Sequence, residues 1–437
     1  MMRPATANLA VCASLTMLTA SPSAVRSEYT QAGDLDSGFP DNAPSRDGLI
    51  SMARILCVLY PDPQSGYPPP YARDEIPAVT WDVDGAPAPM PQPPLGFVPG
   101  QLVGCVSGEL GLREYLESHG HEFVVTSDKE GPDSEFARLL PSADIVISQP
   151  FWPAYLTRER IASAPHLRLA LTAGIGSDHV DLEAAAEAGI TVAEVTGSNS
   201  DSVAEHIVMM VLALVRNYLP SHETAASGGW NIAECVSRGY DVQGMAFGAV
   251  GAGRIGRGVL RRLAPFGLQL HYTQRHRLAP ALEEELGLTF HPDIGQMAQH
   301  MDIISLQVPL YPATRHLFDA ELLGSLRRGT YLVNCGRAEL VDPAAVDAAV
   351  RSGHLAAYAG DVWNPEPAGA DDPWRSMPWN GMTPHISGTT LSAQARYAAG
   401  TLDILQRFLE GRPIEEDYLI VEGGGLAGTG AQSYGLR

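Results

Sequence analysis

A glycine-rich turn between two segments of different periodicity constrains the fold of this 437-residue chain most strongly. The run "MAFGAV", ending at Val250, is a short apolar segment typical of a buried strand. It leads into a Gly-x-Gly-x-x-Gly turn at residues 251–256, and that turn opens the helical segment "IGRGVLRRLAPFG". With the second strand "LQLHYT" after it, this arrangement is typical of a dinucleotide-binding unit. Its first glycine permits the tight turn, its second lets the backbone approach a pyrophosphate, and its third lets the helix pack closely on the strand.

Short apolar runs alternate with helical segments on both sides of this unit. The expected strands are "MARILCVLY", "HEFVVTS", "ADIVISQP", "LRLALTAG" and "ITVAEVT" before the turn, and "MDIISLQVPL", "TYLVNCG", "AAYAGDV" and the short "MTPHIS" after it. This alternation predicts an α/β protein with two Rossmann-like, doubly wound domains and a cleft between them.

Residues 202–218, "SVAEHIVMMVLALVRNY", predict one long helix with Ser200 or Asp201 as its N-cap. The segment is apolar almost all round, so we expect it to be buried between domains or in a subunit interface.

Residues 1–51 have a different character. They are acidic and turn-rich with a weak signal-peptide pattern, and we predict a disordered extension or a mis-assigned start, with the folded chain beginning at Met52. The net charge of −21 argues against nucleic acid and anionic membranes as partners. The five cysteines are widely spaced and include no Cys-x-x-Cys pair, so we expect reduced thiols, no metal and a cytoplasmic protein.

Four polar residues follow expected strands of the second half or lie within the last of them: Arg337, Asp361, Glu366 and His385. Because ligands of doubly wound sheets bind at the carboxyl ends of the strands, we expect these side chains near the dinucleotide.

The order of these features resembles the D-2-hydroxyacid dehydrogenase superfamily. Several blocks resemble one branch of it, the bacterial formate dehydrogenases without metal: "LYPDPQSGYPPPYARD", "VSGELGLREYLESHGHEFVVTSDKEGPDSEF", "SQPFWPAYLT", "LTAGIGSDHVDL", "GGWNIAECVSRGYD" and "TPHISGTTLSAQARYAAGT". The resemblance implies a substrate-binding domain made of residues 52–199 and 387–437, a dinucleotide-binding domain at 200–386, and a homodimer to which the long helix contributes.

Oxidation of formate requires a hydride to leave carbon, with no O–H proton to remove, so the protein must orient the anion and exclude water. Arg337 offers a two-pronged donor for the carboxylate, and Asn199 can add an amide donor, unless it caps the following helix. The glycines around Ile175 let a backbone N–H approach a small ligand. His385 can donate to formate and help to position the nicotinamide ring. Two aromatic residues can wall the site, or belong to the core: Phe151 and Trp152.

Gln274 occupies the position where a carboxylate is expected to hold the adenosine ribose of NAD. A carboxylate there would repel a 2′-phosphate, whereas Gln274 does not, and Arg275, with His276 and Arg277 nearby, adds positive charge. We therefore predict that NADP is preferred over NAD, with use of both left open. The other residues expected at the cofactor are Gly251, Gly253, Arg254, Ile255, Gly256, Pro309, Asp361 and Ser387.

Glu366 departs from the pattern of the branch, in which the resemblance implies glutamine. The wider superfamily has glutamate there, paired with histidine as an acid–base dyad that moves a proton. Three functions stay open: an NADP-preferring formate dehydrogenase, an NAD(P)-dependent D-2-hydroxyacid dehydrogenase that uses His385 and Glu366, and an inactive dinucleotide-binding regulator. The first-domain blocks favour the first function, Glu366 favours the second, and intact Arg337 and His385 argue against the third.

Overall fold

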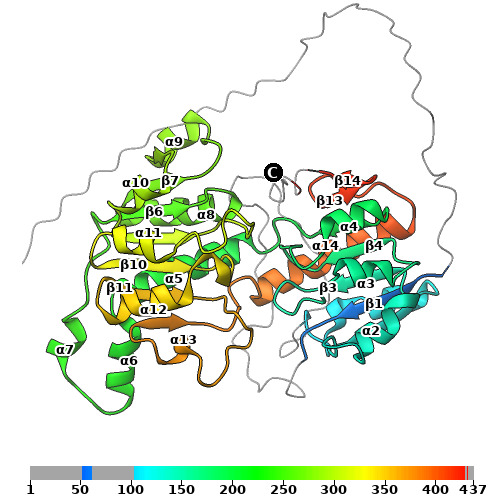
Figure 1. The fold of residues 1–437 in the computed structure, drawn as a ribbon, viewed down its shortest axis with the longest axis horizontal. Helices are drawn as coiled ribbons and strands as arrows, with labels where there is room; N and C mark the ends of the chain where they lie inside the picture. Colours follow the sequence, from blue (N-terminus) through cyan, green and yellow to red (C-terminus); the bar gives the residue numbers. More distant parts are fainter. Residues whose placement is uncertain (1–51, 62–102, 429–430, 432–437) are drawn as a thin grey trace, which may run out of the picture. The chain divides into compact units, whose positions relative to one another are not determined.

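The computed structural model describes residues 52–61, 103–428 and 431. The predicted extension at residues 1–51 lies outside the described residues. The described chain forms two seven-stranded sheets, each with helices packed on both of its faces (Figure 1). The predicted α/β class with two Rossmann-like sheets is therefore confirmed.

The first sheet has the strand order β14-β13-β5-β4-β3-β1-β2. Its parallel strands are β1 (Arg54–Val58), β2 (Glu122–Thr126), β3 (Ile145–Ser148), β4 (Leu169–Thr172) and β5 (Thr191–Glu194). Two strands from the other end of the chain complete it in antiparallel pairing, β13 (Leu419–Glu422) beside β5 and β14 (Gly425–Leu426) beside β13. Two segments far apart in the sequence thus build one sheet.

Helices cover both faces of the first sheet. One face carries α1 (Arg113–Ser118) and α14 (Leu391–Leu409), and the other carries α2 (Glu135–Leu139), α3 (Arg158–Ala162) and α4 (Leu182–Glu187). Short 3₁₀ turns precede α1 and follow α2, at Glu109–Gly111 and Leu140–Ser142. The predicted helix "GELGLREYLESHG" is interrupted at Leu110, whose φ is 53°.

The second sheet has the order β12-β11-β10-β9-β6-β7-β8, and all of its pairs are parallel. Its strands are β6 (Ala246–Val250), β7 (Gln269–Thr273), β8 (Thr289–His291), β9 (Ile303–Leu306), β10 (Thr330–Asn334), β11 (Leu355–Gly360) and β12 (Asn380–Met382). The strand order reverses between β6 and β9, and the glycine turn follows β6. This turn therefore lies at the switch point where doubly wound sheets bind ligands.

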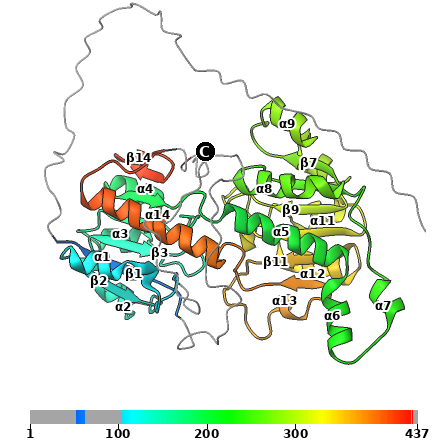
Figure 2. The ribbon, with the colours of Figure 1, turned by 180° about the vertical axis from the view of Figure 1, so that it is seen from behind.

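The helices of the second sheet also form two layers. One face carries α5 (Ser200–Val215) and α8 (Arg254–Leu263), which Figure 2 shows in front of the strands. The other face carries α10 (Ile294–Ala298), α11 (Ala320–Ser325), α12 (Pro343–Arg351) and α13 (Pro373–Ser376). The remaining elements are α6 (Tyr218–Ala226), α7 (Ile232–Val236), α9 (Pro280–Leu286) and the 3₁₀ turns Ala264–Phe266 and Ala338–Leu340.

The predicted bounds of the long helix are wrong at both ends. Helix α5 has Asn199 at its N-cap position, so Asp201 lies in the first turn, where its carboxylate accepts a hydrogen bond of 2.6 Å from Arg262 of α8. The helix ends at Val215 because the backbone of Asn217 is left-handed, with a φ of 52°, and α6 follows. Glu205 and Met209 of α5 are exposed in the single chain, so burial of this helix in a subunit interface stays a prediction.

No single helix among the described residues is long and apolar enough to cross a membrane, and α5 with α6 meet that requirement only as a pair, across a 68° bend. Cys57, Cys235 and Cys335 form no disulfide. In the same described part of the chain, no cluster of three or more His, Cys, Asp and Glu side chains could hold a metal ion.

Candidate active site

The glycine turn has the geometry that its sequence predicts. Gly251 has a φ of +95°, which favours glycine, and a Cβ on Gly256 would collide with the carbonyl oxygen of Gly251. Gly253 is different: it is exposed, and nothing lies within 4 Å of its Cβ position. Helix α8 begins at Arg254 directly after it, so Arg254 and Ile255 form the first helical turn beside open space. Backbone amides in such a turn can hold a pyrophosphate.

Gln274 lies immediately after β7 and next to this turn. Its Oε1 accepts a hydrogen bond of 3.0 Å from the backbone N–H of Ala252, and its Nε2 donates over 2.5 Å to the carbonyl of His276. The amide oxygen therefore supports the turn without the negative charge of a carboxylate.

The cations after Gln274 have different partners. Arg275 and His276 are exposed, and the guanidinium of Arg275 lies 5.8 Å from the ring centre of Tyr311. Arg277 instead forms an ion pair of 2.7 Å with Glu283 of α9. The expectation that Arg277 adds charge for a phosphate stays a prediction, with Glu283 as the partner of Arg277 in this structure.

Arg337 follows β10 and contacts Asp178, which follows β4. Its Nε donates to Oδ2 over 3.0 Å and its Nη2 to Oδ1 over 2.5 Å, while Nη1 donates over 3.0 Å to the carbonyl of Gly336. Partial removal from water tends to raise the pKa of Asp178, but the charge and hydrogen bonds of Arg337 hold it well below its usual range. Sequence reasoning missed Asp178, although it stands in the block "GIGSDHVDL", because its partner is 159 residues away.

The turn that carries Ile175 is fixed from within the first sheet. Gly174 and Gly176 have φ values of +139° and +116°, and a Cβ on Gly176 would collide with Nη2 of Arg337. The buried carboxylate of Glu194 accepts hydrogen bonds from the N–H of Gly176, at 3.0 Å, and from the hydroxyl of Ser177, at 2.9 Å. The turn that carries Ile175 is therefore held against Arg337 through Gly176.

His385 and Glu366 form a pair. Nδ1 of His385 lies 2.8 Å from Oε2 of Glu366, whose Oε1 accepts a hydrogen bond of 2.7 Å from the N–H of Trp363. Glu366 thus contacts His385 while its side chain stays partly exposed to solvent. The predicted strand "MTPHIS" is wrong in its second half, because Pro384 has no N–H to continue the ladder and β12 ends at Met382. His385 lies in the loop beyond, with a φ of +56°.

Asp361, at the end of β11, lies under the loop that carries His385 and is fully buried. Its Oδ1 accepts hydrogen bonds from the hydroxyl of Thr383 and the N–H of Ile386, at 2.6 and 2.9 Å, and its Oδ2 accepts one of 2.7 Å from the N–H of Ser387. The structure therefore shows Asp361 as a support for this loop, and Ser387 as buried against it.

Asn199 is nearly buried at the start of α5, yet its side chain makes no capping hydrogen bond. Its Oδ1 has no hydrogen-bond partner in the described part of the chain. A Cβ on Gly388 would come within 2.6 Å of its Nδ2, so the amide packs against the segment after Ser387. The capping alternative for Asn199 is thereby excluded.

The remaining predicted site residues, Trp152, Phe151 and Pro309, have contacts that do not indicate a role in the site. Trp152 packs edge-on against Tyr60 at 5.4 Å, lies 4.8 Å from Nζ of Lys129 and joins the core of the first sheet. Phe151 is partly buried beside it. Pro309 is exposed after β9, and its carbonyl accepts a hydrogen bond of 2.8 Å from the hydroxyl of Thr314.

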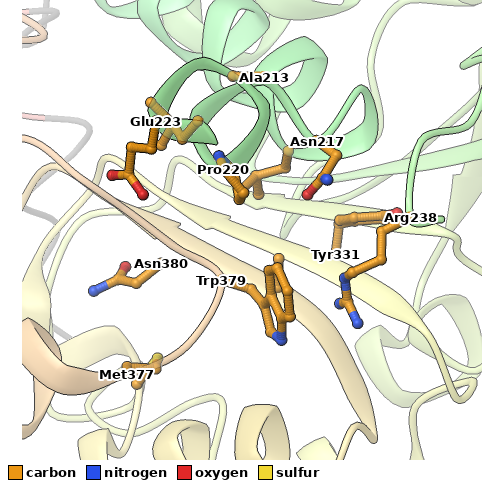
Figure 3. Close-up of a pocket in the computed structure, with 12 residues that line it drawn as sticks. Ala213, Asn217, Pro220, Glu223, Arg238, Tyr331, Met377, Trp379 and Asn380 are labelled. Carbon is orange, nitrogen blue, oxygen red and sulfur yellow. The ribbon is translucent and has the colours of Figure 1, made fainter. Parts of the chain in front are cut away.

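Two of the pockets among the described residues differ in their relation to Arg337. One, of about 410 Å³, is lined by Asp178, Leu310, Tyr311, Pro312 and Arg315, and it adjoins Arg337 through Asp178. The other, of about 230 Å³, lies at α5, α6 and the strands β10–β12 (Figure 3). None of the predicted site residues lines either pocket, and only the first is lined by Asp178, the partner of Arg337.

Comparisons with known proteins agree with this geometry. Residues 208–387 match the NAD-binding domain of the D-isomer-specific 2-hydroxyacid dehydrogenases. The chain is 63% identical to a formate dehydrogenase of Pseudomonas sp. (strain 101) over 383 residues, which are 88% of this chain and 95% of that protein. A solved formate dehydrogenase of Granulicella is 64% identical, with a TM-score of 0.83, over 86% of this chain and all of that one. An NAD-dependent formate dehydrogenase of Staphylococcus aureus, solved in complex with NAD, is 39% identical, with a TM-score of 0.70, over 84% of this chain and 99% of that one. The chain therefore belongs to the formate dehydrogenases of the D-isomer-specific 2-hydroxyacid dehydrogenase family.

Proposed function

We propose that this protein oxidises formate to carbon dioxide by direct transfer of a hydride to a nicotinamide dinucleotide, with NADP preferred over NAD. The observation that carries the proposal is that Arg337 lies against the turn of Ile175, while the His385–Glu366 pair follows β11 and β12, strands of the same sheet as β10, which precedes Arg337. Relatives that match nearly the whole described chain are formate dehydrogenases, which supports formate as the substrate.

The residues present fit a dinucleotide. The exposed amide turn at Gly253 has open space for a pyrophosphate, and Gln274 with Arg275 borders the place of the adenosine ribose. When bound, the dinucleotide supplies the ring that accepts the hydride.

The side chains of this protein bind and orient formate. Arg337 binds the carboxylate of formate, Asn199 donates its amide to it, and the Ile175 turn limits the site to a small ligand. His385 donates a hydrogen bond to formate and is oriented by Glu366. These contacts hold the C–H bond towards the cofactor and exclude water, which is the main contribution that a protein makes to hydride transfer.

The preference for NADP rests on the same loop. Gln274 keeps the hydrogen bond to Ala252 that a carboxylate would make, but it brings no charge that repels a 2′-phosphate. Arg275 and His276 are exposed beside it and can meet that phosphate, although Arg277 is bound to Glu283.

A second function has one specific observation in its favour. The pair His385–Glu366, at 2.8 Å, has the acid–base geometry that oxidation of a 2-hydroxy acid requires. Initial rates with formate, D-lactate and glycerate, each with NAD and NADP, separate the candidates. We expect the highest kcat/KM with formate and NADP. A higher value with a 2-hydroxy acid would establish the second function, and no turnover with any substrate would identify a dinucleotide-binding regulator.

We further propose that two copies of the chain form a homodimer through the segment 218–240. Large apolar side chains are unusually exposed there, among them Trp230 at 84%, Ile232 at 68% and Val236 at 62%. The pocket in Figure 3 adjoins this segment, and its Arg238 lies 4.0 Å above the ring of Trp379. Large exposed apolar side chains beside a pocket are typical of a subunit interface, and a two-fold axis would let each copy cover the other's segment.

A further inference from the structure

We infer that Asp178 is a built-in competitor for the substrate's carboxylate at Arg337, and that it sets the affinity for formate while holding Arg337 in position. The inference rests on the proposed function, in which Arg337 receives that carboxylate.

The contact itself has the geometry of substrate recognition. Asp178 accepts two roughly parallel hydrogen bonds from Arg337, 3.0 Å from Nε and 2.5 Å from Nη2. This is the two-pronged arrangement by which a guanidinium recognises any carboxylate. Formate must therefore either meet the Nη1–Nη2 edge of Arg337 while Asp178 stays, or take the edge that Asp178 now occupies.

Asp178 and Arg337 are both accessible from solvent. Its side chain is 37% exposed and that of Arg337 25%. Asp178 also lines the pocket of about 410 Å³ that Tyr311 and Arg315 border. The pair is thus accessible to small solutes, unlike a buried structural ion pair.

The charge of Asp178 acts against an anionic ligand. Because Arg337 favours its ionised form, Asp178 is negatively charged at neutral pH and cancels the charge of Arg337. A formate ion thus meets a nearly neutral pair rather than a bare cation, and an unscreened like charge within a few ångström of it weakens its binding.

The same contact fixes Arg337. The flexible side chain belongs to the second sheet, whereas Asp178 follows the rigid turn of Ile175 in the first sheet. The ion pair therefore holds the guanidinium beside that turn before substrate arrives, at the expense of affinity. Asp178 is a positioning residue with two effects: it orients Arg337, and it weakens the binding of formate. Substitutions of Asp178 can separate these two effects.

The test compares Asp178→Asn and Asp178→Ala with the parent. Asparagine keeps the size and one acceptor but removes the charge, whereas alanine removes both. A matched control is Asp347→Asn on α12, which makes the same change in charge at a carboxylate paired with Arg351 at 2.8 Å. Each protein is assayed for kcat and KM with formate. Binding of nitrate, a planar monoanion that cannot give a hydride, is measured by calorimetry with oxidised cofactor present.

For Asp178→Asn we expect the KM for formate and the Kd for nitrate to fall by about threefold or more, with kcat changed by less than about twofold. The difference from the parent should shrink as salt is added. Asp178→Ala should also bind nitrate more tightly but lose kcat, because Arg337 is no longer oriented. Asp347→Asn should match the parent in all three quantities.

An unchanged or higher Kd for nitrate in both Asp178 variants would overturn the inference and leave Asp178 a purely structural partner of Arg337. Nitrate binding needs no turnover. Absence of formate oxidation in the parent would therefore refute the proposed function, while the nitrate comparison would still decide the role of Asp178.

Discussion

At the scale of single residues, Arg337 is the side chain on which capture of the substrate depends. We predict that Arg337→Ala lowers kcat/KM for formate by at least about a hundredfold, because a charge-assisted, two-pronged contact contributes about 3 kcal/mol or more to a transition state. Binding of the dinucleotide, followed by fluorescence titration, should hardly change. Arg351→Ala, which removes an arginine paired with Asp347, is the control. Retention of more than about a tenth of the activity would contradict this role, since that loss is below about 1.4 kcal/mol.

Gln274 is expected to determine the choice of cofactor. In Gln274→Asp a carboxylate can still accept the N–H of Ala252, but it repels a 2′-phosphate and binds ribose hydroxyls. The ratio of kcat/KM for NADP to that for NAD should fall by at least about tenfold, or about 1.4 kcal/mol. Gln299→Asp, at an exposed position after α10, adds the same charge elsewhere and should leave the ratio unchanged. A ratio that stays constant in Gln274→Asp would remove this residue from cofactor selection.

Glu366 places a carboxylate next to the proposed site of an anionic substrate, through its contact with His385. In Glu366→Gln an amide oxygen can still accept a hydrogen bond from His385, but no carboxylate repels formate. The KM for formate, measured at one pH in both proteins, should therefore fall in Glu366→Gln. Equal KM values would show that the substrate does not interact with the carboxylate.

At the scale of elements, the turn before α8 contains one glycine that is needed for packing, Gly256, and one that is needed for binding of the dinucleotide, Gly253. A Cβ on Gly256 would collide with the carbonyl oxygen of Gly251, so Gly256→Ala must push α8 away from β6. Overpacking of this kind typically lowers the unfolding free energy by about 1–3 kcal/mol. Gly253 has open space at its Cβ position. Gly253→Ala should therefore keep the parent's unfolding free energy and lose only affinity for the dinucleotide. Denaturant unfolding without cofactor, with binding measured in parallel, checks both variants. Equal stability of the two variants would refute this division.

The elements that the sequence predicts well are those whose signal is local. The runs around β3, β4, β6 and β10 are apolar and bounded by turn residues, and each forms a strand close to its predicted place. The end of α5 depends on the left-handed backbone of Asn217, and the end of β12 depends on Pro384. The periodicity of apolar residues indicates neither of these two ends. The strand β8 is only three residues long, which is too short for a clear pattern. The strand β13 is recognised as part of the first sheet only through its pairing with β5.

In the candidate site too, the features with a local sequence signal are the ones that the sequence predicts. The glycine turn, Gln274 and the residues after strands are visible in the sequence because strand ends of one sheet converge. The pairing of Asp178 with Arg337 and the support that Asp361 gives to the loop of His385 are tertiary contacts. They depend on distances across the fold that one sequence does not contain.

At the scale of the whole molecule, the segment 218–240 is expected to control assembly. Trp230→Asp places a charge at the most exposed of its large apolar side chains and should weaken the proposed dimer by at least about tenfold, because aromatic anchors dominate interface energies. Phe266→Asp makes the same change at an exposed aromatic outside the segment and should have no effect. Sedimentation at several concentrations measures both. A monomeric parent, or equal dissociation of the two variants, would refute this interface.

The interrupted order of the first sheet has a consequence for synthesis of the chain. The second sheet is built from one continuous stretch, β6 to β12, which is complete once residue 382 has left the ribosome. The first sheet must wait longer, because Leu405, Leu409 and Leu419 belong to its core and β13 closes the edge of β5. Until then, the apolar face that α14 covers is exposed to solvent. The half of the chain that is translated first is thus the last to complete its core, and during that interval a growing polypeptide most needs protection by chaperones.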